Sequence, residues 1–222
     1  MSLNKTLSEL RVLAVDDQPI ILHMMAGVLN QLGLHHVETA QSAEIALAML
    51  EAGNIDLVLV DIEMDGMNGL ELVKRIRCNQ TGLSSATPVL VVTSHTEASV
   101  LGTAIALDVN GIVAKPAKPE QLVHKISEAI NAEFKARPRI GYEVIRTDVV
   151  EPLEADELPV GQPQKVTLEH LEEGMVLAAP VTTKEGKIML NQGIRLNNNT
   201  IQRIAEVVAL LDDQPMFEVI AD

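Results

Sequence analysis

Short runs of apolar residues alternate with longer runs of helical period from residue 11 to about residue 130, and this alternation constrains the fold most. Most of the short runs are rich in Val, Leu and Ile with few polar interruptions, which is typical of strands buried on both faces of a parallel sheet. The pattern predicts an α/β fold with a doubly wound five-stranded parallel sheet. Its predicted strands are Arg11–Val15, His36–Ala40, Asp56–Val60, Pro88–Thr93 and Gly111–Ala114.

The character of the chain changes after Ala132. Four prolines fall between residues 138 and 163, and the same stretch contains the acidic segment EPLEADELP. Such a stretch sustains no long helix and buries little, so it predicts a linker with one short element near Tyr142–Ile145. We therefore expect a first domain over residues 8–132, a linker over 133–164 and a second module over 165–222.

The second module has the pattern of a small mixed α+β unit. We expect a hairpin formed by Met175–Val181 and Lys187–Leu190, turning at Lys184–Gly186, then a helix at Asn199–Leu211 and a final strand at Met216–Ile220. No spacing of residues in this module is typical of a catalytic site. We expect an output or interaction module rather than an enzyme.

Composition excludes several classes of function. The formal net charge is −14, and it is shared equally between residues 1–130 and 131–222, so neither half offers a basic surface for duplex DNA or anionic membranes. Cys78 is the only cysteine and can form no internal disulfide. No apolar run has the length of a membrane span, and the N-terminus lacks the pattern of a secretory signal. The expectation is a cytoplasmic protein with no membrane partner.

Polar residues follow the predicted strands where each strand ends. Asp16 and Asp17 follow the first strand, Asp61 the third and Lys115 the fifth, while Thr93 ends the fourth. In a parallel sheet these ends share one edge, where ligands bind. Clustered carboxylates repel one another unless a cation joins them, and oxygen ligands suit Mg²⁺. The cluster predicts a Mg²⁺ site beside a carboxylate that can accept a phosphoryl group.

Four segments carry a family resemblance. VDDQP, DLVLVDIEMDGMNGLELVKRIR, VLVVTSH and GIVAKP are together similar to the response-regulator receiver family over about 120 residues. The resemblance implies a flavodoxin-like fold with strand order 2-1-3-4-5. It also implies a cis peptide between Lys115 and Pro116.

The same resemblance assigns roles to the residues at the strand ends. It implies that Asp61 is the phospho-acceptor and that Thr93 and Lys115 contact the phosphoryl group. Mg²⁺ would be held by Asp17, Asp61 and the backbone carbonyl of Glu63, and Asp16 would position a water on the ion.

The function implied is that of a response regulator in a two-component phosphorelay. The donor would be a sensor histidine kinase or a histidine phosphotransfer protein, and the signal would pass by protein–protein interaction to an output protein that the sequence does not name. A homodimer is left open, and direct DNA binding is not expected.

Three alternatives stay open at this point. One is a transcriptional regulator with an atypical C-terminal DNA-binding module, which the acidic charge disfavours. A second is an adaptor in cyclic-dinucleotide signalling, because residues 166–204 resemble a β-rich segment of some bacterial signalling proteins. The third is an enzyme on the same fold, either a phosphatase using Asp61 as nucleophile or a nucleotide-dependent protein. The aspartate spacing does not match an aspartyl-phosphatase pair, and no glycine-rich nucleotide-binding loop follows the first strand.

Overall fold

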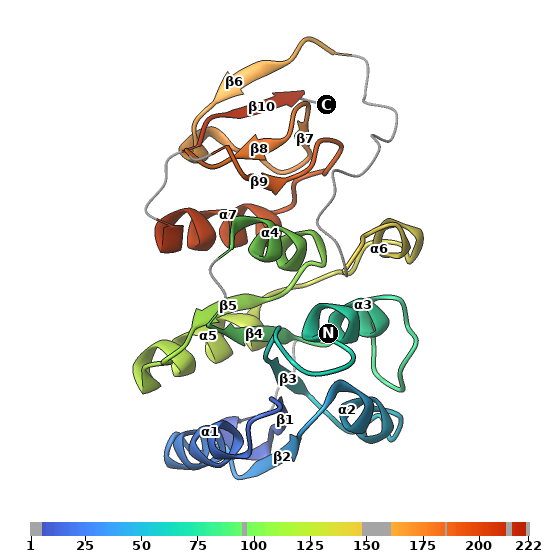
Figure 1. Cartoon of the computed structure of the whole chain (residues 1–222), viewed down its shortest axis with the longest axis vertical. Helices are drawn as coiled ribbons and strands as arrows, with labels where there is room; N and C mark the ends of the chain where they lie inside the picture. Colours follow the sequence, from blue (N-terminus) through green and yellow to red (C-terminus); the bar gives the residue numbers. More distant parts are fainter. Residues whose placement is uncertain (1–5, 95–96, 148–160, 185, 212–214, 221–222) are drawn as a thin grey trace. The chain divides into compact units, whose positions relative to one another are not determined.

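The computed structural model of the chain describes residues 6–94, 97–147, 161–184, 186–211 and 215–220 (Figure 1). It divides into two compact units that are not continuous in sequence. One unit comprises Met1–His95 and Val109–Val144, and the other comprises Thr96–Asp108 and Ile145–Asp222. Each unit contains its own β-structure and is described separately.

A five-stranded parallel sheet forms the centre of the first unit. Its strands are β1 (Arg11–Val15), β2 (His36–Ala40), β3 (Leu57–Val60), β4 (Val89–Thr93) and β5 (Gly111–Ala114), in the order β2-β1-β3-β4-β5. The predicted doubly wound, flavodoxin-like sheet is confirmed. The third and fourth strands each begin one residue later than predicted; the residue before β4, Pro88, has no backbone N–H to donate to a neighbouring strand.

Local sequence signals begin the helices that connect these strands. Proline occupies the first turn of α1 (Pro19–Gln31) and α5 (Pro119–Asn131), where its missing N–H costs nothing. Ser42 caps α2 (Ala43–Leu50), and Asn68 caps α3 (Gly69–Arg77), each accepting a backbone N–H from the first turn. A 3₁₀ turn at Leu7–Glu9 precedes β1.

The core of the first unit lies on both faces of its sheet. Alternate residues of β1, β3 and β4, such as Val12, Leu59 and Val92, pack with apolar residues of α1 and α5. Val113 of β5 belongs to the same cluster, and Val37 of β2 packs against it. On another part of the sheet, α2 packs against β1 and β2 and also contacts α3. In β1, β3, β4 and β5 nearly all residues are buried on both faces, as their near-continuous apolar runs predict, whereas the edge strand β2 is only partly buried.

The second unit contains one helix from the first half of the chain and the C-terminal elements. These are α4 (Ala98–Ala106), β6 (Gln164–Val166), a 3₁₀ turn (Leu168–His170), β7 (Val176–Leu177), β8 (Val181–Thr182), β9 (Ile188–Leu190), α7 (Asn198–Leu211) and β10 (Phe217–Ile220). They form an antiparallel sheet in the order β6-β10-β7 and a separate β8-β9 pair. Within the described ranges, no helix is long and apolar enough to cross a membrane.

The predicted strand Met175–Val181 is wrong in one respect, because the structure divides it between two sheets. Its first part, β7, pairs with β10, and its last residue begins β8, which pairs with β9. Pro180 lies between them, and a proline cannot donate to a strand ladder, so the strand cannot run through that position. Strand β6 was not predicted at all.

The described residues of the predicted linker include a short helix, and the last residue of that linker, Gln164, begins β6. Helix α6 spans Ile140–Glu143, and within it Tyr142 is fully buried, with its hydroxyl accepting the Arg137 N–H at 2.8 Å. The acidic part of this linker, residues 148–160, lies outside the described residues, as does Glu185 in the predicted turn.

A buried guanidinium ties α3 to the loop before β4. The Arg77 side chain is 1% exposed, and it donates to the carbonyls of Ser85 and Thr87 and to Asn110 Oδ1, at 2.8 to 2.9 Å. Its guanidinium also stacks 4.8 Å from the ring centre of Phe134. The Asn110 oxygen accepts the Val89 N–H as well, so the same network fixes the start of β4.

We predict that Arg77→Met lowers the free energy of unfolding by about 3 kcal/mol, because buried acceptors lose their donors. Arg75→Met is the matched control on the same helix: the Arg75 side chain is 38% exposed and pairs with Glu71 one turn away, so its loss should be below about 0.5 kcal/mol. Urea unfolding monitored by circular dichroism measures both. Equal losses in the two variants would contradict a structural role for the buried arginine.

Candidate functional site

The carboxyl ends of four parallel strands bring the predicted site residues to one edge of the first unit's sheet. Val15 at the end of β1 is in register with Val60 at the end of β3, so Asp16 and Asp61 follow neighbouring strands at the same level. The Asp61 N–H donates to the Val15 carbonyl at 2.9 Å, which extends this pairing. On the next pair of strands, Thr93 at the end of β4 is in register with Ala114 at the end of β5, and Lys115 follows directly.

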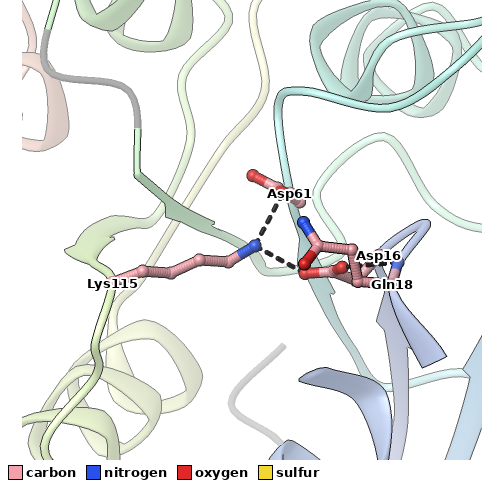
Figure 2. A network of polar contacts seen from close by, with 4 residues as sticks. All are labelled: Asp16, Gln18, Asp61 and Lys115. Atoms are coloured by element: carbon pink, nitrogen blue, oxygen red, sulfur yellow. Dashed lines mark hydrogen bonds and ion pairs between the residues drawn. The ribbon is translucent and has the colours of Figure 1, made fainter. Parts of the chain in front are cut away.

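The Lys115 ammonium joins two buried carboxylates (Figure 2). Its Nζ lies 2.5 Å from Asp16 Oδ2 and 2.6 Å from Asp61 Oδ2. The Asp16 and Asp61 side chains are 0% and 3% exposed, and that of Lys115 is 15% exposed. The other oxygen of Asp16 accepts the Gln18 N–H at 2.9 Å, which fixes this carboxylate at the turn into α1.

The surroundings of Lys115 act on its pKa in opposite directions. Burial is the largest single influence, and it lowers the pKa by penalising the charged ammonium. The hydrogen bonds and the charges of Asp16 and Asp61 together outweigh it, so the pKa of Lys115 is raised above its ordinary value of 10.5. The ammonium is therefore a fixed positive charge at neutral pH.

Two carboxylate oxygens of the cluster are suited to a cation. Asp17 Oδ1 and Asp61 Oδ1 are buried, and no group in the described part of the chain donates a hydrogen bond to either. A buried carboxylate oxygen without a donor is costly unless a cation faces it. Mg²⁺ binds through one or two carboxylates and keeps several waters, so these residues fit the ion.

The structure does not bring all of the predicted site residues equally close together. Over the described ranges, no three His, Cys, Asp or Glu side chains group closely enough to hold a metal by themselves. Glu63 is exposed, two residues beyond Asp61, while Thr93 is fully buried at the end of β4. The expected cis peptide between Lys115 and Pro116 is confirmed.

Two residues that support the site were not identified from the sequence. At Gly69, a Cβ atom would lie 1.9 Å from the Asp61 carbonyl oxygen, so any side chain would displace the acceptor strand from α3. Glu44 of α2 accepts the Met67 N–H at 3.2 Å and thereby holds the loop after Asp61. The motif contains Gly69, but no spacing in the sequence links Glu44 to this loop.

The pKa of Glu44 reflects these contacts. Its own backbone N–H, the Ser42 hydroxyl and the Met67 N–H all stabilise the carboxylate, and they lower the pKa of Glu44 below its ordinary value.

Comparison with known proteins identifies a family for the first part of the chain. The response regulator receiver domain family matches residues 12–127. The chemotaxis protein CheY of Pseudomonas aeruginosa is 31% identical over 125 residues, covering 55% of this chain and 99% of that protein. The crystallised CheY4 of Vibrio cholerae superimposes with a TM-score of 0.50 at 32% identity, covering 54% of this chain and 98% of that chain.

A match to a much larger protein has the same extent. The sensor histidine kinase AruS of Pseudomonas aeruginosa is 32% identical over 123 residues, which is 55% of this chain but only 12% of the kinase. Each of these similarities covers about half of the chain.

We predict that Lys115→Met lowers the free energy of unfolding by about 3 kcal/mol at neutral pH, because two buried carboxylates lose their counter-ion. The raised pKa of Lys115 gives this contribution a pH dependence. The stability that Lys115 contributes is fully present below pH 10.5, the ordinary pKa of a lysine. It is lost as the pH rises through the higher pKa of Lys115 in the folded state. Chemical unfolding of both proteins from pH 7 to 11.5 measures the difference, which should shrink only at the alkaline end.

Lys125→Met is the control for this measurement. The Lys125 side chain is 14% exposed, nearly as buried as that of Lys115, but its ammonium pairs with a partly exposed residue, Glu128, one turn away. We expect a loss below about 1 kcal/mol. A Lys115 effect no larger than this would contradict the bridging role.

Proposed function

Because the chain belongs to the response regulator receiver family through residues 12–127, we propose that it is the phosphoryl-accepting component of a two-component phosphorelay, with Asp61 as the acceptor. Receiver domains are signalling modules that are generally not enzymes, and the acidic pocket of the family generally binds Mg²⁺. The donor would be a sensor histidine kinase or a histidine phosphotransfer protein.

The observation that carries this proposal is the asymmetric environment of Asp61. One oxygen of its carboxylate is held by the Lys115 ammonium at 2.6 Å, and the other is buried with no donor in the described part of the chain. A carboxylate so placed is fixed in orientation yet retains an oxygen that can attack an electrophile.

In the proposed transfer, a carboxylate oxygen of Asp61 attacks the phosphorus of a phosphohistidine. An O–P bond forms and the P–N bond breaks, with its electron pair passing to the imidazole nitrogen of the donor. The product is an acyl phosphate on Asp61. The fixed positive charge of Lys115 then lies within reach of the negative charge on the transferred oxygens.

The remaining residues of the cluster would divide two tasks. Asp17, Asp61 and the Glu63 carbonyl would hold Mg²⁺, and Asp16 would complete the acidic set. When bound, the ion neutralises charge on the phosphoryl oxygens. Thr93, buried at the end of the neighbouring strand, would contact the phosphoryl group through its hydroxyl.

The rest of the chain would carry the signal onward. We assign residues 8–132 to the receiver, 133–164 to a linker and 165–222 to an output or interaction module that acts by protein–protein contact. The acidic net charge of −14 supports a protein partner over direct binding to DNA.

We predict that Asp61→Asn abolishes phosphorylation by acetyl phosphate in the presence of Mg²⁺, because an amide does not form an acyl phosphate. Phosphate-affinity electrophoresis and intact mass both report the modification. Asp65→Asn is the matched control, since Asp65 is an exposed carboxylate of the same loop and should leave labelling intact. Undiminished labelling of Asp61→Asn would refute the assignment, and rapid turnover of acetyl phosphate to inorganic phosphate would favour a phosphatase instead.

Asp17→Ala should weaken Mg²⁺ binding at least about tenfold, because one carboxylate and one carbonyl hold the ion poorly. Titration followed by isothermal calorimetry or by NMR shifts of the residues around Asp61 measures this. Glu63→Gln is the control: its carbonyl rather than its exposed side chain would be the ligand, so its effect should be much smaller. Equal losses in both variants would contradict the proposed ligand set.

A further inference from the structure

Glu44 is the second residue of α2, and its carboxylate reaches the loop that joins Asp61 to α3. One face of α2 is buried, and the helix packs against β1 and β2 and contacts α3 (Figure 1). The carboxylate therefore extends from an element that the core holds in place. The loop that it reaches contains Glu63, whose carbonyl is one of the proposed Mg²⁺ ligands.

This loop, residues 62–68, has little stiffness of its own. It contains no proline, and Gly66 adopts a left-handed backbone with φ of 77°, a conformation that glycine permits at little cost. At its base the Gly69 N–H donates to the Ile62 carbonyl at 2.9 Å, which brings the two ends of the loop together. A loop of this composition depends on contacts with neighbouring elements to keep a single conformation.

Glu44 contacts two consecutive residues of the loop. Its Oε1 accepts the Met67 N–H at 3.2 Å, and a Cβ atom built on Gly66 would lie 3.2 Å from the same oxygen. The carboxylate therefore lies against the backbone at the left-handed position itself. Its own N–H, the Ser42 hydroxyl and the Met67 N–H hold the pKa of Glu44 below its ordinary value, so the group is charged at neutral pH. A hydrogen bond to a charged acceptor is stronger than one between neutral groups.

We propose that Glu44 is a positioning residue of the Mg²⁺ site, which holds the loop after Asp61 in the conformation that presents the Glu63 carbonyl to the ion. This inference rests on the proposed ligand set of Asp17, Asp61 and Glu63. Glu63 lies three residues before Gly66, so the backbone that Glu44 contacts leads directly to the proposed ligand. Glu44 touches neither the ion nor the phosphoryl group in this proposal and acts through the loop.

The expected size of the effect follows from the population of the loop. A loop that samples several conformations binds an ion more weakly than a loop held in the competent one, because the apparent dissociation constant rises as the competent fraction falls. Without the Glu44 contact we expect the competent fraction to fall to about one third to one fifth, which weakens Mg²⁺ binding about three- to fivefold. The hydrogen bond is exposed, which keeps the effect modest.

Three variants of the full chain separate the contact from the charge. Glu44→Asp keeps the charge, but its side chain is one methylene shorter and does not reach the loop. Glu44→Gln loses the charge, but its amide oxygen can still accept the Met67 N–H, and Glu44→Ala loses both. Isothermal calorimetry with Mg²⁺ alone measures the dissociation constant. We expect it to rise about three- to fivefold in Glu44→Asp and Glu44→Ala, and less than about twofold in Glu44→Gln.

Glu120→Ala is the matched control, because Glu120 is also an exposed acid at the second position of a helix, α5. It removes the same favourable interaction with a helix dipole and should leave Mg²⁺ affinity within about twofold of the natural chain. A second readout needs no ion. Hydrogen exchange at the Met67 amide, followed by NMR, should be about threefold faster or more in Glu44→Ala and Glu44→Asp, and near the natural rate in Glu44→Gln.

The outcomes distinguish this inference from the function on which it rests. A natural chain that binds no Mg²⁺ would overturn both. If the natural chain binds the ion, normal affinity in Glu44→Ala and Glu44→Asp would overturn the inference alone, as would unchanged exchange at Met67 in these variants. Equal losses in Glu44→Gln and Glu44→Ala would also overturn it, because the effect would then come from the charge of Glu44 and not from its contact with the loop.

Discussion

The Lys115 ammonium is the interaction on which the site depends, because it connects residues that follow β1, β3 and β5. Three separate strand ends must arrive at one level for a single Nζ to lie within 2.6 Å of both Asp16 and Asp61. The parallel register places these strand ends beside one another, and the core packed on both faces of the sheet holds the strands in that register. The pair of carboxylates could not remain buried and charged without this ammonium. The chemistry of the site therefore requires this order of strands and these strand lengths.

The parts of the fold that were predictable are those that local pattern determines. A strand buried on both faces must be apolar along nearly its whole length, which is why β1, β3, β4 and β5 could be predicted to within one residue. The edge strand β2 is less buried, and it could be predicted from its place in the alternation of strands and helices. The candidate site followed from them, because Asp16, Asp61 and Lys115 come directly after strands whose ends share an edge. Four helices of this unit also begin at local signals, the prolines of α1 and α5 and the capping residues Ser42 and Asn68.

What the sequence could not supply depends on contacts between distant segments. Nothing near Gly102 indicates that the main chain of Met189 packs against it, and nothing near Asp108 indicates the start of α7. In the same way, a run from Met175 to Val181 looks like one strand, although its two ends pair in different sheets. Even Glu44, which holds the loop after Asp61, is an ordinary first-turn acid by its local pattern. These contacts join residues that are far apart in the sequence, and the sequence around each partner is ordinary, so it does not indicate the contact.

The discontinuous path of the second unit bears on how such a chain can be rearranged in evolution or in the laboratory. Helix α4 enters this unit from between β4 and β5, so no single cut separates the unit from the parallel sheet. A chain ended after α5 would keep α4 but lose β9 and α7, and would expose the apolar side chains that they help to cover. The C-terminal segment likewise cannot be grafted onto another receiver as an independent cassette, because it would arrive without its helix. Recombination would have to exchange α4 and the C-terminal segment together, so two separate stretches of the gene are inherited as one structural part.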